Sequence, residues 1–198
     1  SPSAVRYSEN IFVKKLQGYF HLMKPRVMIL VIFTAFVGMM LAPDTILPIN
    51  YFYVLLSISL GAGSSAAFNM WFDEDIDKSM ERTKTRPIPL GVISKTEALF
   101  FGFITGIISL LIMYYVSNTL ATSLLLFTIL FYVFIYTFWL KRSTSLNIVI
   151  GGAAGAIPPI IGWVTVVPEI NYLPIMMFLI IFFWTPPHFW ALAVYRFN

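Results

Sequence analysis

Six long apolar stretches separated by polar segments constrain the fold of this chain more than any other feature of its sequence. A helix of about 20 mainly apolar residues is needed to cross the roughly 30 Å hydrocarbon core of a membrane. Only 11% of the residues are charged and 59% are hydrophobic, whereas soluble domains carry roughly 25% charged residues. This excludes a soluble globular domain and a disordered chain. We therefore predict a single all-α domain over residues 1–198, a multi-pass transmembrane bundle with six helices near residues 27–42, 51–72, 98–116, 120–140, 146–167 and 172–194.

The distribution of charge supports this count of helices. If the helices alternate in direction, all 13 Lys and Arg residues fall on one side of the membrane, in segments 1–26, 73–97, 141–142 and 196. The opposite side carries only Asp44 and Glu169. The positive-inside rule then places the N-terminus, the C-terminus and the long 73–97 loop in the cytoplasm. Because the basic residues lie between apolar runs rather than on a soluble face, we expect no nucleic-acid binding.

The segment that precedes the first apolar stretch resembles neither of two common targeting signals. It has no apolar core of the kind that defines a signal peptide. It also has no Arg- and Ser-rich transit sequence, which favours a bacterial inner membrane over the mitochondrial inner membrane. Instead, Ile11, Phe12, Leu16 and Phe20 with Lys14 and Lys15 among them predict a short amphipathic helix on the membrane surface.

Two stretches, residues 61–67 and 151–156, consist only of Gly, Ala and Ser. Small residues allow membrane helices to approach closely, so the simpler interpretation is helix packing. The alternative is that closely packed helices leave their neighbouring faces to line a cavity.

Asn69, Asp73 and Asp77 follow one another at four-residue spacing where the second predicted helix reaches the cytoplasm. At about 100° per residue they fall within an arc of about 80°, and Asp75 points to the opposite side. Oxygen ligands without His or Cys suit Mg²⁺, so we predict that these three residues hold this ion. The alternative is an acidic loop that is balanced by nearby bases. The chain has no cysteine, which excludes cysteine nucleophiles and Cys-based zinc sites.

Arg82, Lys84 and Arg86 come directly after the acidic residues. Arginine offers a fork of donors to phosphate, and lysine offers a mobile charge. Carboxylates for a metal followed by bases for its anion predict a site for a diphosphate, in a cytoplasmic catalytic loop over residues 73–97. Interaction with acidic lipid headgroups is the competing explanation for each of these bases.

These motifs resemble those of a known family. The pattern Asn-x-x-x-Asp-x-x-x-Asp, followed by Arg-Thr-x-x-Arg-Pro at residues 82–87, is similar to the first aspartate-rich motif of the UbiA-type intramembrane prenyltransferases. The resemblance implies an all-helical, Mg²⁺-dependent enzyme that transfers an isoprenoid chain from its diphosphate. Asp73 and Asp77 would hold the metal, with Asn69 as a neutral ligand.

Three further segments resemble the haem O synthase branch of this family. They are residues 24–28, 151–163 with its Pro158-Pro159 pair, and 184–193. The resemblance implies transfer of farnesyl from farnesyl diphosphate to a vinyl group of haem b (protohaem IX). The product would serve terminal oxidases directly or through a haem A synthase. Family members resemble a nine-helix bundle with a second acidic motif after the sixth helix, so we expect this chain to be C-terminally truncated.

Four residues outside the acidic loop complete the candidate site. Lys141 is expected to reach the diphosphate, unless it only anchors its helix at the interface. Asn147, just inside the fifth helix, is expected to face the cavity. Arg26 is a candidate for a haem propionate or the diphosphate. His188 follows Pro186-Pro187, which should break the sixth helix, and we expect it to contact haem iron or a propionate, with a packing role as the alternative.

Two other functions are consistent with parts of the pattern. The first is a prenyltransferase of the same family that acts on an aromatic ring such as 4-hydroxybenzoate, although the Trp-Thr-Pro-Pro-His-Phe-Trp segment at residues 184–190 has no evident use for a phenol. The second is a cation transporter. Transporters place their coupling charges near the middle of the membrane, and here the predicted spans are nearly free of charge.

Overall fold

The computed structural model describes residues 7–197, and every regular element within this range is a helix. Arg6, which was counted among the predicted cytoplasmic charges, lies outside the described residues, as does the side chain of Arg196. The helices are α1 (Ile11–Leu22), α2 (Pro25–Leu41), α3 (Pro48–Phe72), α4 (Glu74–Ser79), α5 (Lys95–Val116), α6 (Thr119–Leu130), the π-helix η1 (Phe131–Leu140), α7 (Lys141–Ser143), α8 (Asn147–Ala156), α9 (Pro158–Val166) and α10 (Tyr172–Phe197).

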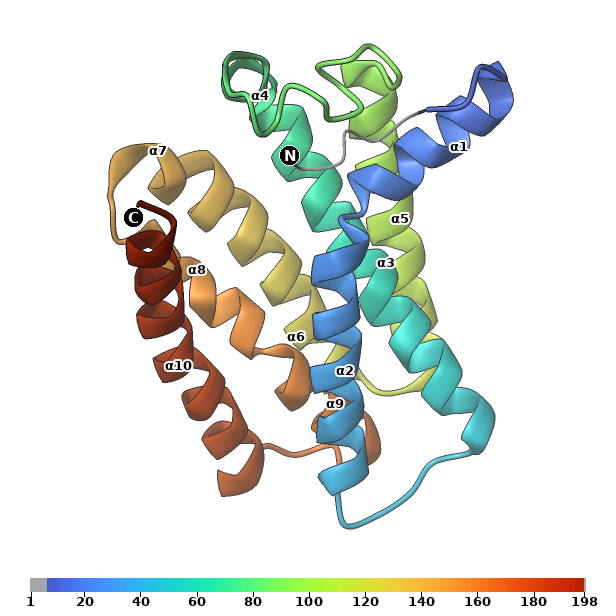
Figure 1. The fold of residues 1–198 in the computed structure, drawn as a ribbon. Helices are drawn as coiled ribbons and strands as arrows, with labels where there is room; N and C mark the ends of the chain where they lie inside the picture. Colours follow the sequence, from blue (N-terminus) through green and yellow to red (C-terminus); the bar gives the residue numbers. More distant parts are fainter. Residues whose placement is uncertain (1–6, 198) are drawn as a thin grey trace.

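The predicted multi-pass helical bundle is confirmed. Five helical segments are long and apolar enough to cross a membrane: α3, α5, the continuous run Thr119–Ser143, the run Asn147–Val166, and α10. The predicted first span corresponds to α2, which meets α1 at a bend of 50°, and the count reaches six when α1 and α2 are taken together as one bent span. In Figure 1, α1, α4, α7 and the end of α10 lie at one end of the bundle, and the loops at 42–47 and 167–171 lie at the other. The chain is therefore a multi-pass membrane protein whose basic segments gather at one end.

The helix predicted ahead of the first span is confirmed as α1. The side chain of Asn10 caps it by accepting hydrogen bonds from the backbone N–H groups of Phe12 (3.0 Å) and Val13 (3.3 Å). Ile11 and Phe12 are exposed, as is expected for a helix that rests on a membrane surface. That location stays a prediction.

Small residues bring the helices into close contact. The two predicted stretches take part, because the hydroxyl of Ser64 donates to the carbonyl of Gly102 at 2.6 Å and a Cβ on Gly151 would lie 2.6 Å from the ring of Tyr136. These contacts confirm the packing interpretation, and other small residues pack the helices in the same way. Between α3 and α5, two reciprocal hydrogen bonds form, both at 2.6 Å. The hydroxyl of Ser57 donates to the carbonyl of Ser109, and the hydroxyl of Ser109 donates to the carbonyl of Ser57. Between α2 and α9, a Cβ on Gly38 would lie 2.1 Å from the carbonyl oxygen of Pro159. A Cβ on Gly162 would likewise lie 2.0 Å from the carbonyl oxygen of Ala35.

Gly162→Ala is therefore expected to push α9 away from α2. We expect the free energy of unfolding to fall by about 2–3 kcal/mol, the upper part of the range of about 1–3 kcal/mol found when a well-packed core is overfilled. Gly155→Ala is the matched control, because no atom lies within 4 Å of a Cβ at that position, and alanine there should leave stability unchanged or slightly higher. Thermal unfolding of both variants in detergent measures the difference, and equal midpoints would contradict the packing argument.

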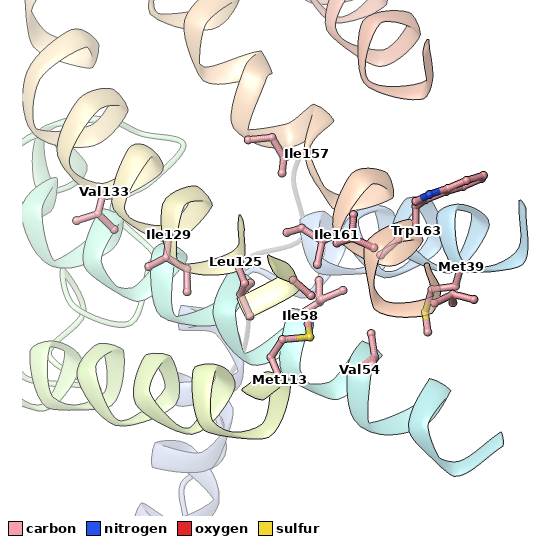
Figure 2. Close-up of a cluster of buried hydrophobic side chains, with 14 residues drawn as sticks. Met39, Val54, Ile58, Met113, Leu125, Ile129, Val133, Ile157, Ile161 and Trp163 are labelled. Carbon is pink, nitrogen blue, oxygen red and sulfur yellow. The ribbon is translucent and has the colours of Figure 1, made fainter. Parts of the chain in front are cut away.

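The core of the bundle lies toward the end opposite the basic segments. Figure 2 shows how buried side chains meet there, among them Met39, Ile58, Met113, Leu125 and Ile161. Three of these, Ile58, Leu125 and Ile161, also line a cavity that extends from the core toward the basic end of the bundle. The packed core thus forms the floor of that cavity.

Proline and a π-helix shape three spans in ways that the sequence analysis did not anticipate. The predicted break at Pro186-Pro187 is wrong, because α10 passes through both residues. Membrane helices tolerate such prolines where Ser or Thr hydroxyls help to satisfy the backbone, and the hydroxyl of Thr185 donates to the carbonyl of Ile181 at 2.7 Å.

The fifth span is the broken one, since α9 begins at Pro158, where proline suits a first helical position. In the fourth span the N–H of Lys141 donates to the carbonyl of Tyr136, five residues earlier.

Candidate active site

The acidic residues lie where α3 ends and α4 begins. The chain keeps its helical register through this junction, because the N–H of Asp73 donates to the carbonyl of Asn69 (3.0 Å) and that of Asp77 donates to the carbonyl of Asp73 (2.8 Å). Asn69, Asp73 and Asp77 are consequently on one buried face, with 1%, 1% and 3% of their surface exposed. Asp75 is exposed and points away, as the four-residue spacing predicts.

Basic side chains from distant parts of the sequence surround these buried groups. Nη1 of Arg86 donates to both carboxylate oxygens of Asp77, at 2.9 and 2.7 Å. The ammonium of Lys141 is hydrogen-bonded to Oδ2 of Asp73. The ammonium of Lys24 is hydrogen-bonded to Oδ1 of Asn69. The site is therefore a buried cluster of alternating acidic and basic groups, at the basic end of the bundle.

Arg142 fixes the outer edge of this cluster. Its guanidinium donates to both oxygens of Asp75, at 2.9 and 3.2 Å, and to the carbonyl of Phe72 at 3.1 Å. It also stacks over the ring of Phe72, 4.4 Å from the ring centroid. The hydrogen bonds from Arg142 lower the pKa of Asp75.

Lys24 is a site residue that the sequence analysis quoted only as part of a motif. It joins α1 to α2 in a left-handed backbone conformation, with φ of 50° and ψ of 67°. Such a conformation is uncommon for residues other than glycine, and it tends to occur at functional sites. Burial of the ammonium group, with Arg86 and Lys141 close by, lowers the pKa of Lys24 to about 7. Its position directly before Pro25, at the start of a span, was the one available signal.

Thr137 and Thr83 are further residues that the sequence analysis missed. Both are buried. The side-chain amide of Asn69 donates to the hydroxyl of Thr137 at 3.5 Å, which ties the cluster to η1. The hydroxyl of Thr83 donates to the carbonyl of Asp77 at 3.1 Å, which fixes the loop that carries Arg86. No local sequence pattern distinguishes Thr137 from threonines that merely pack, whereas Thr83 is the second residue of the Arg-Thr-x-x-Arg-Pro motif at residues 82–87.

An apolar cavity of about 400 Å³ adjoins the cluster and shares Lys24 with it. Its walls come from α2, α3, α6, η1, α8, α9 and α10, and both predicted small-residue stretches contribute to them, which bears out the second interpretation of those stretches as well. Its volume is within the range of about 300–1,000 Å³ that is typical of sites for small organic ligands. Its lining includes Val27, Ile58, Gly61, Leu125, Tyr132, Tyr136, Gly151, Gly155, Thr185 and Phe189.

One buried oxygen indicates that the cluster could accept a cation. Oδ1 of Asp73 has no hydrogen-bond partner, and Nη2 of Arg142 lies 3.9 Å from it. Residues 7–197 hold no group of three or more His, Cys, Asp or Glu side chains arranged for a metal ion. Mg²⁺, however, usually binds through one or two carboxylates and completes its shell with water and substrate phosphate. Asp73, Asp77 and the amide oxygen of Asn69 fit that requirement.

The structure does not bring every predicted residue to the cluster. Arg82 is exposed, and Lys84 is half exposed and pairs with Glu81 at 2.6 Å. Arg26 is exposed on α2 and is not among the residues that line the cavity. Charged side chains on a loop and at a helix start are easily solvated, and nothing in the fold draws these three inward.

Asn147 and His188 also lie outside the cavity, which for Asn147 is contrary to expectation. The side-chain amide of Asn147 donates to the carbonyl of Lys141 at 3.4 Å, so it supports the backbone that carries Lys141. His188 is exposed on α10 and stacks on Trp184 with 4.2 Å between ring centroids. Because α10 is not broken by its prolines, its register turns Thr185 and Phe189 toward the cavity and His188 away from it.

The described residues thus form a membrane bundle whose apolar cavity ends in buried carboxylates and bases. The chain belongs to the UbiA prenyltransferase family, which matches residues 31–197. It is 54% identical over 177 residues to the protoheme IX farnesyltransferase of Pelagibacter ubique, an alignment that covers 89% of this chain and 58% of that protein. It is 57% identical over 180 residues to the protein of the same name from Sinorhizobium fredii, covering 91% and 57%.

A solved structure has the same fold. The structure of a UbiA homolog from Archaeoglobus fulgidus, bound to DMAPP and Mg²⁺, superposes with a TM-score of 0.69 at 17% identity, over 85% of this chain and 60% of that one. At that identity the likeness concerns the fold. The chain spans between half and two thirds of the length of the relatives that it matches.

Proposed function

We propose that this chain carries the diphosphate site of an enzyme that transfers a farnesyl group from farnesyl diphosphate to a vinyl group of haem b. The observation that carries the proposal is the buried Asn69–Asp73–Asp77 face, with Lys24, Arg86 and Lys141 on it, beside an apolar cavity. Two comparisons support it: relatives that are more than 50% identical are named protoheme IX farnesyltransferases, and the Archaeoglobus homolog is bound to Mg²⁺ and an allylic diphosphate.

The polar cluster would hold the diphosphate and its metal. Asp73 and Asp77, with the amide oxygen of Asn69, would hold Mg²⁺, which when bound would neutralise charge on the leaving diphosphate. Arg86 and Lys141 would bind the diphosphate oxygens, since both already reach the carboxylates. We assign Arg82 and Lys84, which lie toward solvent, the smaller role of attracting the substrate anion to this end of the bundle.

The cavity would hold the farnesyl chain and exclude water. The allylic C–O bond breaks with its electron pair on the diphosphate oxygen, and the haem vinyl group then donates its π electrons to the farnesyl carbon. Water adds to the resulting cation on the porphyrin side and loses a proton, which leaves a hydroxyethyl-farnesyl substituent. Tyr132 and Tyr136 on the cavity wall are placed to stabilise the allylic cation through their aromatic faces.

For the acceptor, we propose that haem approaches along the outer face of α10. His188 is exposed there beside Trp184 and Phe189, and it would contact haem iron or a propionate. Arg26 would contact a propionate. Asn147 would contribute indirectly, by holding the backbone that carries Lys141. We propose a bacterial inner membrane as the location, since relatives of this chain are bacterial.

His188→Ala is expected to weaken the use of haem several-fold and to leave the affinity for farnesyl diphosphate unchanged, because His188 is exposed on α10 and does not line the cavity. Steady-state kinetics with each substrate varied in turn measure the two effects. Phe183→Ala, another exposed aromatic residue on α10, is the control for a general change of that surface. An equal loss for both substrates would favour a packing role for His188.

A competition assay tests the function. Membranes that contain this chain are incubated with Mg²⁺, farnesyl diphosphate and equal amounts of haem b and 4-hydroxybenzoate, and the extract is analysed by mass spectrometry. We expect farnesylated haem. A farnesylated phenol would contradict the haem assignment and support an aromatic-ring acceptor. The assay is repeated with a chain extended to the length of the relatives, and no product from either form would contradict the enzymatic proposal.

A further inference from the structure

We propose that Lys24 and the divalent metal compete for one atom, Oδ1 of Asn69, and that the ammonium displaced by the metal moves to the diphosphate. This inference rests on the proposed function, because it concerns the same site. It predicts that metal and diphosphate bind together rather than independently.

The competition follows from the hydrogen bonds of Asn69. Its Nδ2 donates to Oδ2 of Asp73 at 2.9 Å and to the hydroxyl of Thr137 at 3.5 Å, and these bonds fix the orientation of the amide. Oδ1 accepts from Lys24. An amide nitrogen does not coordinate Mg²⁺, which takes oxygen ligands. Asn69 can therefore serve as a metal ligand only after its oxygen is released by Lys24.

The distribution of partners shows why Lys24 is the group that gives way. Arg86 and Lys141 are each bonded to a carboxylate, whereas Lys24 is bonded to a neutral amide. A hydrogen bond to a neutral acceptor is weaker than one to a charged acceptor. Lys24 also lines the cavity, so its flexible side chain can turn from Asn69 toward an anion at that end of the cavity.

The balance of charge explains why metal and diphosphate would bind together. Two buried carboxylates, Asp73 and Asp77, face three basic side chains. The positive groups of the cluster therefore outnumber its carboxylates before any metal binds. Because like charges repel, this excess of positive charge disfavours binding of a divalent cation alone. A diphosphate that arrives with the metal supplies the missing negative charge and gives the displaced Lys24 a partner.

Binding of Mn²⁺, followed by electron paramagnetic resonance in detergent-solubilised protein, tests the competition. For wild type we expect weak binding of Mn²⁺ alone and clearly tighter binding when inorganic pyrophosphate is added. Lys24→Met is expected to bind Mn²⁺ alone about tenfold more tightly, the change that corresponds to one lost charge-assisted hydrogen bond, and to lose most of the enhancement by pyrophosphate. Lys24→Arg should restore the enhancement. Lys15→Met, in which a half-exposed lysine of α1 that pairs with Glu97 is changed, should behave as wild type.

Wild-type protein provides a second measurement if Lys24→Met fails to fold. Acetylation of Lys24 by acetic anhydride, followed by mass spectrometry, should become faster with Mn²⁺ alone and slower with Mn²⁺ plus pyrophosphate. Equal Mn²⁺ affinity in wild type and a folded Lys24→Met variant would overturn the competition, as would acetylation that Mn²⁺ does not change. Absence of Mn²⁺ binding in every variant, even with pyrophosphate, would instead contradict the proposed function.

Discussion

Asp73→Asn is expected to reduce Mg²⁺-dependent release of diphosphate from farnesyl diphosphate by about 1,000-fold. Asp73 is 1% exposed, and its Oδ1 is the buried oxygen without a hydrogen-bond partner. Asparagine has nearly the same shape but removes the negative charge, and metal stabilisation of a leaving group contributes several kcal/mol to the barrier, where each 1.36 kcal/mol is a factor of ten. A pyrophosphate-release assay over a range of Mg²⁺ concentrations measures the loss.

Asp75→Asn is the matched control for this experiment. Asp75 is two residues away and has the same side chain, but it points outward to Arg142, so turnover should be nearly unchanged. Insertion of both variants into the membrane and their unfolding midpoints should be compared with wild type, because Asp73 also pairs with Lys141. Turnover retained by a correctly inserted Asp73→Asn protein would rule out Asp73 as a metal ligand.

Arg86→Met is expected to lower the free energy of unfolding by about 2–3 kcal/mol and to weaken binding of farnesyl diphosphate. The carboxylate of Asp77 is 5% exposed and both of its oxygens accept from Arg86. Removing one partner of a buried pair leaves an uncompensated buried charge, which costs about 3–5 kcal/mol. The partial exposure of Arg86, at 22%, reduces the expected cost. Thermal unfolding in detergent and calorimetric titration with farnesyl diphosphate measure the two effects.

Arg82→Met and Lys84→Met separate this role of Arg86 from the general effect of loop charge. Both side chains lie toward solvent, and surface substitutions of this kind usually change stability by no more than about 0.5 kcal/mol. We expect small effects on farnesyl diphosphate affinity that diminish as salt is added. A loss in either variant as large as that in Arg86→Met would show that the loop rearranges to bring all three bases to the substrate.

Local features of the sequence were sufficient to predict the spans, the gathering of the basic segments at one end of the bundle, and the acidic face. Hydropathy and the positive charges defined the six spans, and helical periodicity placed Asn69, Asp73 and Asp77 together. The partner of Asn69 could not be found in this way, because Lys24 lies 45 residues away. Its position depends on the left-handed turn between α1 and α2 and on how these helices pack against α3, neither of which a local pattern encodes.

Proline illustrates the same limit within single helices. Pro158-Pro159 and Pro186-Pro187 are alike as sequences, but one pair starts a new helix and the other continues within α10. The difference depends on whether neighbouring groups satisfy the backbone, and such groups are identified only in the folded bundle. The break expected before His188 is absent for this reason, since α10 continues through both prolines.

A crystal structure with Mn²⁺ and a non-hydrolysable farnesyl thiodiphosphate would test the central claim most directly. The account predicts an anomalous peak for Mn²⁺ beside Asp73 and Asp77, at a metal–oxygen distance of about 2.1–2.2 Å, with the diphosphate on Arg86 and Lys141. It also predicts the farnesyl chain in the 400 Å³ cavity. A metal bound elsewhere, or a chain in the separate apolar groove that Phe68, Phe103 and Phe134 line, would contradict it.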